Sequence, residues 1–257
     1  MKLSMTKWTL AGLVLLSLGA CGQQKESKSS SQKEPASSKQ VAQSSAGKET
    51  SASEATSSDD SDKSTKKAGE VTVDKGVSFN GSYYSVQGKS GDIVIANKHY
   101  PLAADYNPGE DPTAVAALHE LIAAMQAEGY AISDQYSGFR SYETQVVLYQ
   151  SYVNQDGAAA ADRYSARPGY SEHQTGLAFD LIDTSGNLVQ EAGASKWLLK
   201  NAAKYGFIVR YQEGKEASTG YMPESWHLRY IGEDAKDVAA SGKSLEEYFN
   251  FTGGDYE

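Results

Sequence analysis

The sequence predicts an α+β fold in which a central antiparallel sheet is flanked by helices. From residue 111 onward, segments with helical spacing come mainly first, and short apolar segments typical of strands come mainly later. This order is typical of α+β proteins, because parallel α/β sheets require strands and helices to alternate. Residues 71–257 are numerous enough to bury a single core.

The helices are marked by capping residues and by the spacing of apolar side chains. Asp111 and Pro112 predict a helix start, with Asp as the N-cap and Pro at the first helical position. Ser141 suits the N-cap of a second helix, and a third main helix is expected over residues 194–205. Shorter helices are expected over residues 158–164, 234–240 and 245–249.

Short apolar runs predict strands over residues 130–134, 177–182, 207–211 and 226–231. Successive side chains of a strand point to opposite faces of the sheet. We therefore expect Phe179 and Leu181 to face the core, while Ala178 and Asp180 share the opposite face. Residues 71–96 are expected to form short strands with no obvious chemistry.

Residues 22–70 are predicted to form a flexible tether. They contain fourteen Ser, no aromatic residue and one large aliphatic residue, too little apolar surface to offset the entropy of ordering. Residues 71–257 contain 14 Lys and Arg against 25 Asp and Glu, a formal charge of −11. This acidic balance argues against nucleic acid or anionic lipid as a partner of the folded part.

The first twenty residues are predicted to be a secretory signal peptide. Two lysines precede an apolar run over residues 8–18, which is shorter than the roughly 20 residues that span a bilayer. The run ends in L-G-A-C, which resembles the lipobox of bacterial lipoproteins. The resemblance implies cleavage before Cys21, lipid attachment to its sulfur and anchoring at the outer face of the bacterial cell membrane. The alternative is an incidental cysteine in a signal sequence.

Two stretches concentrate residues that can bind metal, S-E-H-Q-T-G-L-A-F-D at 171–180 and E-S-W-H at 224–227. Three protein ligands and one open position are typical of catalytic zinc, and imidazole and carboxylate are suitable zinc ligands. Cys21 is the only cysteine, so thiolate ligands are excluded from the folded domain. A metal-free arrangement stays open at this point, because an Asp at the end of an apolar strand can also cap a helix or pair with Arg.

Glu224 is a candidate general base and acid. A carboxylate beside a metal can take a proton from water and pass it to a leaving amine, and bound zinc polarises a scissile carbonyl. Glu224 and His227 are three positions apart, so a straight strand would point their side chains to opposite faces. We therefore expect Glu224 in the turn after Pro223.

The pattern S-x-H-x6-D followed by E-x-W-H resembles the VanY-type D-alanyl-D-alanine carboxypeptidase family, within a wider group that includes lysostaphin-type peptidases and hedgehog domains. The S-G-F-R-S segment at 137–141 agrees, so the resemblance covers about residues 111–231. It implies one zinc peptidase domain over residues 71–257, with Glu224 as the catalytic base. The lipobox and Ser-rich tether resemble the streptococcal lipoprotein L,D-carboxypeptidases in particular. The zinc ligands that the resemblance implies are His173, Asp180 and His227.

The resemblance also implies that Arg140 holds the substrate at its terminal carboxylate or at the developing oxyanion. The planar guanidinium suits a carboxylate because it donates two parallel hydrogen bonds. Gln145 and Ser171 are expected to line the same pocket. Tyr211 either contacts the substrate from its strand or is an ordinary packed tyrosine.

The implied reaction is removal of the C-terminal D-Ala from peptidoglycan stem peptides by a monomeric enzyme. Both substrates present the same terminal D-Ala carboxylate, so the motifs do not distinguish L,D-cleavage of tetrapeptides from D,D-cleavage of pentapeptides. L,D-cleavage is favoured only by the resemblance to the streptococcal lipoprotein L,D-carboxypeptidases. A cell-wall endopeptidase would not need Arg140 to hold a carboxylate. A non-catalytic wall-binding module would not need Glu224.

Overall fold

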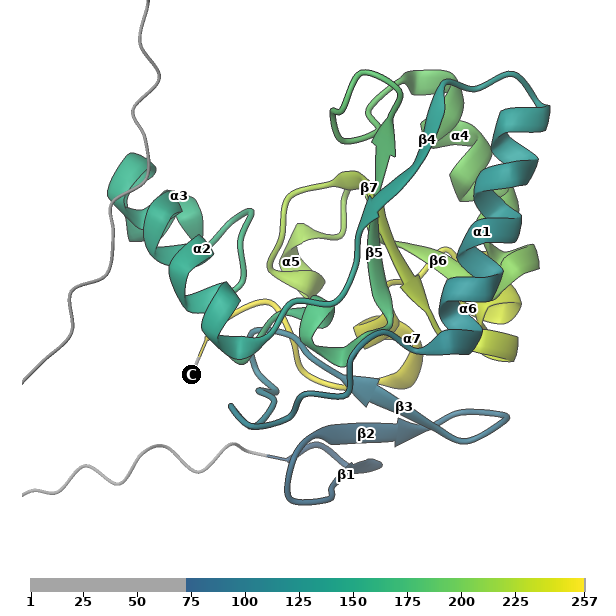
Figure 1. Ribbon diagram of the computed structural model, residues 1–257. Coiled ribbons are helices and arrows are strands. Elements are labelled where there is room, and N and C mark those ends of the chain that lie inside the picture. The colour runs from purple at the N-terminus through teal and green to yellow at the C-terminus, as the bar shows by residue number, and fades with distance from the viewer. Residues whose placement is uncertain (1–72, 257) are drawn as a thin grey trace, which may run out of the picture. The chain divides into compact units, whose positions relative to one another are not determined.

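The protein is described by a computed structural model, in which residues 73–256 are placed and form two antiparallel sheets (Figure 1). The four-stranded sheet has the order β4-β5-β7-β6, and the three-stranded sheet has the order β1-β2-β3. The predicted signal peptide, Cys21 and tether lie outside the described residues. The strands are β1 (Val77–Phe79), β2 (Tyr84–Gln87), β3 (Asp92–Ile95), β4 (Ile132–Ser137), β5 (Ala178–Asp183), β6 (Phe207–Tyr211) and β7 (Glu224–Tyr230).

Helices lie on both sides of the four-stranded sheet, but they pack closely against only one of them (Figure 1). Figure 1 shows α1, α4 and α6 on one side, and α2 and α3 on the other side, where they extend away from the sheet. The helices are α1 (Pro112–Ala127), α2 (Tyr142–Asp156), α3 (Ala158–Ala161), α4 (Ala192–Asn201), α5 (Glu216–Thr219), α6 (Ala235–Ser241) and α7 (Leu245–Phe249). Short 3-10 turns occupy η1 (Glu172–Thr175), η2 (Ala202–Tyr205) and η3 (Gly232–Asp234).

Side-chain caps fix where the main helices begin. The Asp111 carboxylate accepts a hydrogen bond from the Ala114 amide at 2.8 Å, and Ser141 Oγ accepts from the Thr144 amide at 3.3 Å. Both predicted N-caps are therefore confirmed. Helix α4 begins two residues before the predicted start, because Glu191 caps the amides that open the helix.

The other predicted elements differ from the structure mainly at their ends. Strand β6 and helix α7 have the predicted bounds. Strand β4 begins two residues late and runs to Ser137, and α3 ends at Ala161 rather than at residue 164. The short strands expected over residues 71–96 form the three-stranded sheet, which lies beside the end of the four-stranded sheet in Figure 1.

The main core lies between the four-stranded sheet and helices α1 and α4. Phe179 and Leu181 point into it and are fully buried, as their alternation predicted. Asp180 lies on the opposite face of β5, where it is paired across the ladder with His227 of β7. The sheet therefore separates an apolar face from a face that carries ionisable residues. The core residues from α1, α4, β6 and β7 are Leu118, Leu121, Ile122, Met125, Leu198, Phe207, Val209 and Leu228.

Candidate active site

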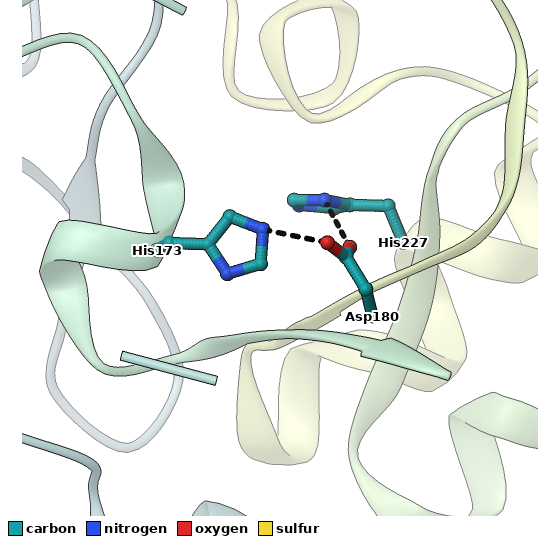
Figure 2. Close-up of side chains that lie close together, drawn as sticks. All are labelled: His173, Asp180 and His227. Carbon is teal, nitrogen blue, oxygen red and sulfur yellow. Dashed lines mark ion pairs between the residues drawn. The ribbon is translucent and has the colours of Figure 1, made fainter. Parts of the chain in front are cut away.

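Two imidazoles and one carboxylate converge on the polar face of the four-stranded sheet. Figure 2 shows the side chains of His173, Asp180 and His227 pointing toward one another. The Nε2 atom of His173 lies 3.1 Å from Asp180 Oδ2, and the Nδ1 atom of His227 lies 3.0 Å from Asp180 Oδ1. One ligand atom from each residue lies within 4.8 Å of the others. The structure thus brings together the three residues predicted to bind zinc.

The loop before β5 brings His173 to the strand. Residues 172–175 form the 3-10 turn η1, and Gly176 ends it with a φ of 72°. A Cβ atom at this position would overlap the carbonyl oxygen of Gly109. Glycine is therefore required both by the left-handed backbone and by the close approach of a second chain segment.

Each histidine has a partner for the ring nitrogen that faces away from the cluster. His173 Nδ1 lies 2.8 Å from the carbonyl oxygen of Gly138, and His227 Nε2 lies 3.2 Å from Glu172 Oε2. Such partners keep the proton on the outer nitrogen and leave the other nitrogen free to bind a metal. With these partners, Nε2 of His173 and Nδ1 of His227 are the nitrogens that face Asp180 and are available to a metal.

The donor set fits zinc. Ligand atoms about 2.1 Å from a tetrahedral ion lie roughly 3.4 Å apart. Here each histidine lies 3.0 or 3.1 Å from one oxygen of Asp180, and one atom from each of the three residues lies within 4.8 Å of the others. When His227 carries its single proton on Nε2, the buried Oδ1 atom of Asp180 has no hydrogen-bond donor, although His227 Nδ1 lies 3.0 Å away. A buried carboxylate oxygen without a donor is costly, and a cation between these atoms would satisfy it.

Asp180 is ionised in this environment. Burial alone would raise the pKa of its carboxyl, but the neighbouring His173 and His227 outweigh that effect and hold the pKa well below its usual range. The carboxylate is therefore available as an anionic ligand at neutral pH.

The structure places Glu224 in the first position of β7 rather than in the preceding turn, so the predicted location is wrong. The reason is an irregularity in the β6–β7 ladder. Val209 pairs with Leu228, but the next paired residues are Tyr211 and Glu224, so β7 uses more residues than β6 over this interval. The bulge turns Glu224 to the face that carries His227, and Glu224 Oε2 lies 3.7 Å from His227 Nδ1.

Burial raises the pKa of Glu224 to about 7, and the carboxylates of Asp180 and Glu172 add to this effect, whereas His227 and Arg140 oppose it. A general base with a pKa near the working pH can both accept and return a proton. A bound cation would lower this pKa and keep the carboxylate ionised at neutral pH.

A pocket of about 210 Å³ opens over these residues, and Arg140, Ser171 and Tyr211 line it together with Glu224. A larger hollow of about 650 Å³, bounded by residues 90–93 and 203–206, contains none of the predicted site residues. The smaller pocket is the candidate active site. Aromatic and apolar residues complete its wall: Leu148, Tyr152, Tyr164, Leu188, Tyr221, Met222 and Trp226.

Gln145 does not line this pocket, contrary to the expectation, but holds Arg140 from behind. Arg140 Nη1 donates to Gln145 Oε1 at 3.0 Å, and Gln145 Nε2 donates to the Ala166 carbonyl at 2.6 Å. Both polar atoms of the Gln145 amide are thus hydrogen-bonded within the protein, and the residue is almost fully buried. In this position Gln145 contacts Arg140 and is turned away from the pocket.

Tyr211 faces the candidate metal site. Its ring lies 4.8 Å from the ring of His227, because the same bulge that turns Glu224 also turns its partner Tyr211 to this face. Burial raises the pKa of Tyr211 well above its usual value, and the negative charge of Glu172 adds to the effect. The hydroxyl therefore stays protonated and can donate a hydrogen bond.

The sequence interpretation did not include three buried charged residues behind the site, Glu172, Arg210 and Arg229. Arg210 Nε and Arg229 Nη1 donate to Glu172 Oε1 at 2.8 and 3.0 Å. An arginine inside an otherwise apolar strand, as in F-I-V-R-Y and H-L-R-Y, is a signal for such pairs, because a buried guanidinium requires an anionic partner.

Comparisons with known proteins agree with this geometry. The sequence profile of the VanY family, D-alanyl-D-alanine carboxypeptidase, matches residues 109–233. The putative carboxypeptidase YodJ of Bacillus subtilis is 36% identical over 190 residues, which cover 64% of this chain and 69% of YodJ. The crystal structure of the L,D-carboxypeptidase DacB from Streptococcus pneumoniae superposes on this chain with a TM-score of 0.69. The two sequences are 69% identical, and the match covers 70% of this chain and 98% of DacB.

A structure of a mutant of the vancomycin-resistance D,D-pentapeptidase VanY, in complex with Zn(II), superposes with a TM-score of 0.53. The two sequences are 32% identical, and the match covers 60% of this chain and 96% of VanY. The chain therefore belongs to the VanY family of D-alanyl-D-alanine carboxypeptidases, as its motifs predicted. It is a carboxypeptidase with a zinc peptidase fold. Zinc is both the metal bound in that VanY structure and the metal that the donor set of this chain fits.

Proposed function

We propose that the protein is a zinc-dependent L,D-carboxypeptidase that removes the C-terminal D-Ala from tetrapeptide stems of peptidoglycan. The observation that carries this proposal is the convergence of three metal-ligand atoms, a buried glutamate and an arginine on one pocket. The 69% identity to the L,D-carboxypeptidase DacB supports the choice of bond.

Arg140 is proposed to bind the terminal carboxylate of the stem. Its guanidinium lines the pocket and is oriented by Gln145 at 3.0 Å and by Ser137 Oγ at 3.4 Å. Charge-assisted hydrogen bonds from a fixed guanidinium favour a free carboxylate over an amide or a continuing chain. This preference makes the enzyme a carboxypeptidase rather than an endopeptidase.

Glu224 is proposed to take a proton from the attacking water and to return it to the amine of the leaving D-Ala. The water oxygen forms a bond with the scissile carbonyl carbon, and the bond from that carbon to the D-Ala nitrogen breaks. A zinc ion held by His173, Asp180 and His227 would act as a Lewis acid toward the carbonyl and the water. Tyr211 is proposed to hydrogen-bond the substrate from the strand β6.

D,D-cleavage of pentapeptides is the second candidate, because the D,D-pentapeptidase VanY is a relative at 32% identity. The purified protein should be incubated with tetrapeptide and pentapeptide stems, and the products should be followed by mass spectrometry. Loss of one alanine from the tetrapeptide but not from the pentapeptide supports the proposal. Loss from the pentapeptide alone assigns the same site to D,D-cleavage, and loss from neither contradicts both.

The surface location is also proposed, on the sequence of the N-terminal segment. The L-G-A-C motif and the apolar run before it favour a lipid on Cys21, which would hold a monomeric enzyme at the outer face of the membrane. Within residues 73–256, none of the helices combines the length and the apolar character needed to cross a membrane. Mass analysis of the N-terminal peptide tests the modification directly. In a second test, we expect the Cys21→Ala protein to be released into the medium.

A further inference from the structure

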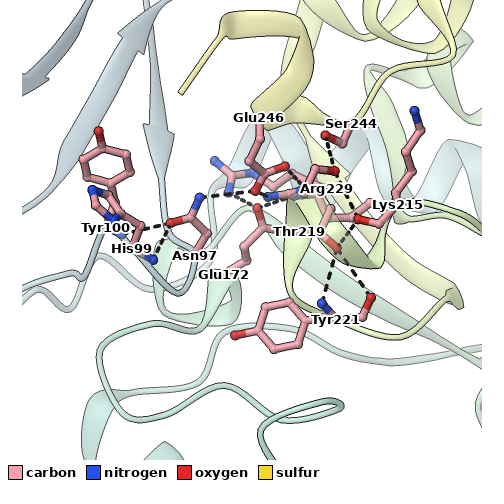
Figure 3. Close-up of polar contacts among 12 residues, drawn as sticks. Asn97, His99, Tyr100, Glu172, Lys215, Thr219, Tyr221, Arg229, Ser244 and Glu246 are labelled. Carbon is pink, nitrogen blue, oxygen red and sulfur yellow. Dashed lines mark hydrogen bonds and ion pairs between the residues drawn. The ribbon is translucent and has the colours of Figure 1, made fainter. Parts of the chain in front are cut away.

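A buried ionic network lies directly behind the candidate metal site. It consists of Glu172, Arg210, Arg229 and Glu246, each at most 3% exposed, and Asn97 adjoins it. Figure 3 shows Glu172, Arg229 and Glu246 gathered between the two sheets, with Asn97 beside Glu246. The two carboxylates and two guanidinium groups balance in charge, which buried ions require.

Glu172 connects this network to a metal ligand. Its Oε2 atom faces His227 Nε2 at 3.2 Å, while its Oε1 atom accepts hydrogen bonds from both arginines. The other ring nitrogen of His227, Nδ1, faces Asp180 at 3.0 Å, so the contact with Glu172 fixes which nitrogen is turned toward the candidate metal site.

Arg210 connects Glu172 to a distant part of the chain. Its Nε atom donates to Glu172, while Nη1 and Nη2 donate to the two oxygens of Glu246 at 2.8 and 2.6 Å. The guanidinium thus bridges two carboxylates in one fixed orientation. Without the charge of Glu246, Arg210 would lose its bidentate partner and could turn away from Glu172.

Glu246 lies outside the region that the VanY profile matches. It is on α7 and accepts a hydrogen bond from Asn97 Nδ2 at 3.2 Å, and Arg229 Nη2 donates to the Val94 carbonyl at 2.6 Å. The profile covers residues 109–233. Segments on both sides of the matched region, β3 with Asn97 and helix α7, therefore reach the back of the metal site.

We propose that Glu246 is a positioning residue for the metal site, acting through Arg210 and Glu172 to hold His227 in the orientation that presents Nδ1 to zinc. This inference rests on the proposed function, because it assumes that the site binds zinc. It goes beyond that function by assigning part of the metal affinity to a helix that contributes no ligand. Partners behind a metal-binding histidine typically change metal affinity by about 10- to 100-fold.

The competing explanation is that Glu246 only attaches α7 to the sheet. In that case its loss would lower the melting temperature equally with and without zinc and would leave zinc affinity unchanged. Positioning predicts a different outcome, because a misplaced His227 weakens the zinc-bound state more than the metal-free state.

The test is to measure zinc affinity of the purified protein by competition with a chromophoric chelator, for wild type, Glu246→Gln, Glu172→Gln and Glu247→Gln. Glu247 is the matched control, because it is the next residue of α7 and its carboxylate pairs with Lys215 on the surface at 2.7 Å. We expect zinc affinity to fall about tenfold in Glu246→Gln and up to about 100-fold in Glu172→Gln. Glu247→Gln should stay within about twofold of wild type, as expected for an exposed pair.

Wild-type affinity in Glu246→Gln overturns the inference, even if that variant melts at a lower temperature. A wild-type protein that binds no zinc instead overturns the proposed function, so the two failures are distinguishable. If Glu246→Gln does not fold, Arg210→Lys decides the question, because it keeps the buried charge but lacks the planar fork that holds Glu172 and Glu246 in one orientation. We expect about tenfold weaker zinc binding in Arg210→Lys, and unchanged binding contradicts the inference.

Discussion

Glu224 and His227 face the same pocket, with 3.7 Å between Glu224 Oε2 and His227 Nδ1, although both lie on strand β7 three positions apart. A regular strand would place them on opposite faces. The bulge opposite Tyr211 removes this conflict. The proposed base therefore lies beside a proposed metal ligand because of a β-bulge in the β6–β7 pairing, and not because Glu224 lies in a loop.

Glu224→Gln keeps the shape of the side chain but removes the base. Because the three metal-ligand atoms are unaffected, zinc binding should persist while kcat falls by roughly 10²- to 10⁴-fold. The measurement pairs steady-state D-Ala release with zinc content in the same sample. Retained turnover with full zinc occupancy would show that another group moves the proton.

Arg140→Lys keeps the positive charge but loses the planar fork that Gln145 orients. We expect KM for a stem peptide to rise by about 10- to 100-fold, equivalent to a loss of roughly 1.5–3 kcal/mol for charged hydrogen bonds. C-terminally amidated stems are the matched substrates. Wild type should strongly prefer the free acid, and the variant should lose most of this preference. Equal cleavage of both substrates by wild type would favour an endopeptidase.

Zinc affinity should rise with pH. Burial alone would lower the pKa of His227, but the carboxylates of Asp180 and Glu172 raise it to about 10 in the metal-free protein. Zinc must displace this proton, so the apparent affinity should increase by up to about tenfold per pH unit below that value. Chelator competition at several pH values between 6 and 8, corrected for the chelator's own protonation, measures the slope. A flat profile would contradict the assignment of His227 as a ligand.

The metal-free protein should lose stability in acid. The pKa of Glu172 is 4.5 before folding and is held lower in the folded protein by Arg210 and Arg229, against the effect of burial. A lowered pKa contributes stability that is present above pH 4.5 and is lost as the pH falls below it toward the folded value. Thermal unfolding in the presence of a chelator, followed from pH 6 to pH 3, should show this loss. The slope should be shallower in Glu172→Gln, and parallel curves for the two proteins would argue against the network.

The sequence predicted the α+β class, and its resemblance to a known family predicted the three residues that converge at the candidate metal site. Alternation along β5 correctly placed Phe179 and Leu181 in the core and Asp180 on the other face. The caps Asp111 and Ser141 located two helix starts, since N-capping is a local interaction that sequence records directly.

The features that were missed depend on contacts between distant segments. The β6–β7 bulge that positions Glu224 arises from pairing between strands, so spacing along one strand could not indicate it. Gln145 contacts Arg140, but the hydrogen bond from its amide to the Ala166 carbonyl, which joins distant segments, was not visible from the sequence. Residues 71–96 carried no recognisable motif, yet Val94 of β3 contacts the network behind His227 through its backbone carbonyl. Asn97, just beyond this range, contacts the network through its side-chain amide.

The most direct test is the release of D-Ala from a tetrapeptide stem before zinc removal, after removal by a chelator, and after zinc is restored. The proposed function predicts activity that disappears with the metal and returns with about one equivalent of zinc per protein. His173→Ala should show no recovery, because one of the three ligands is absent. Undiminished D-Ala release by protein that contains no zinc would contradict the central claim.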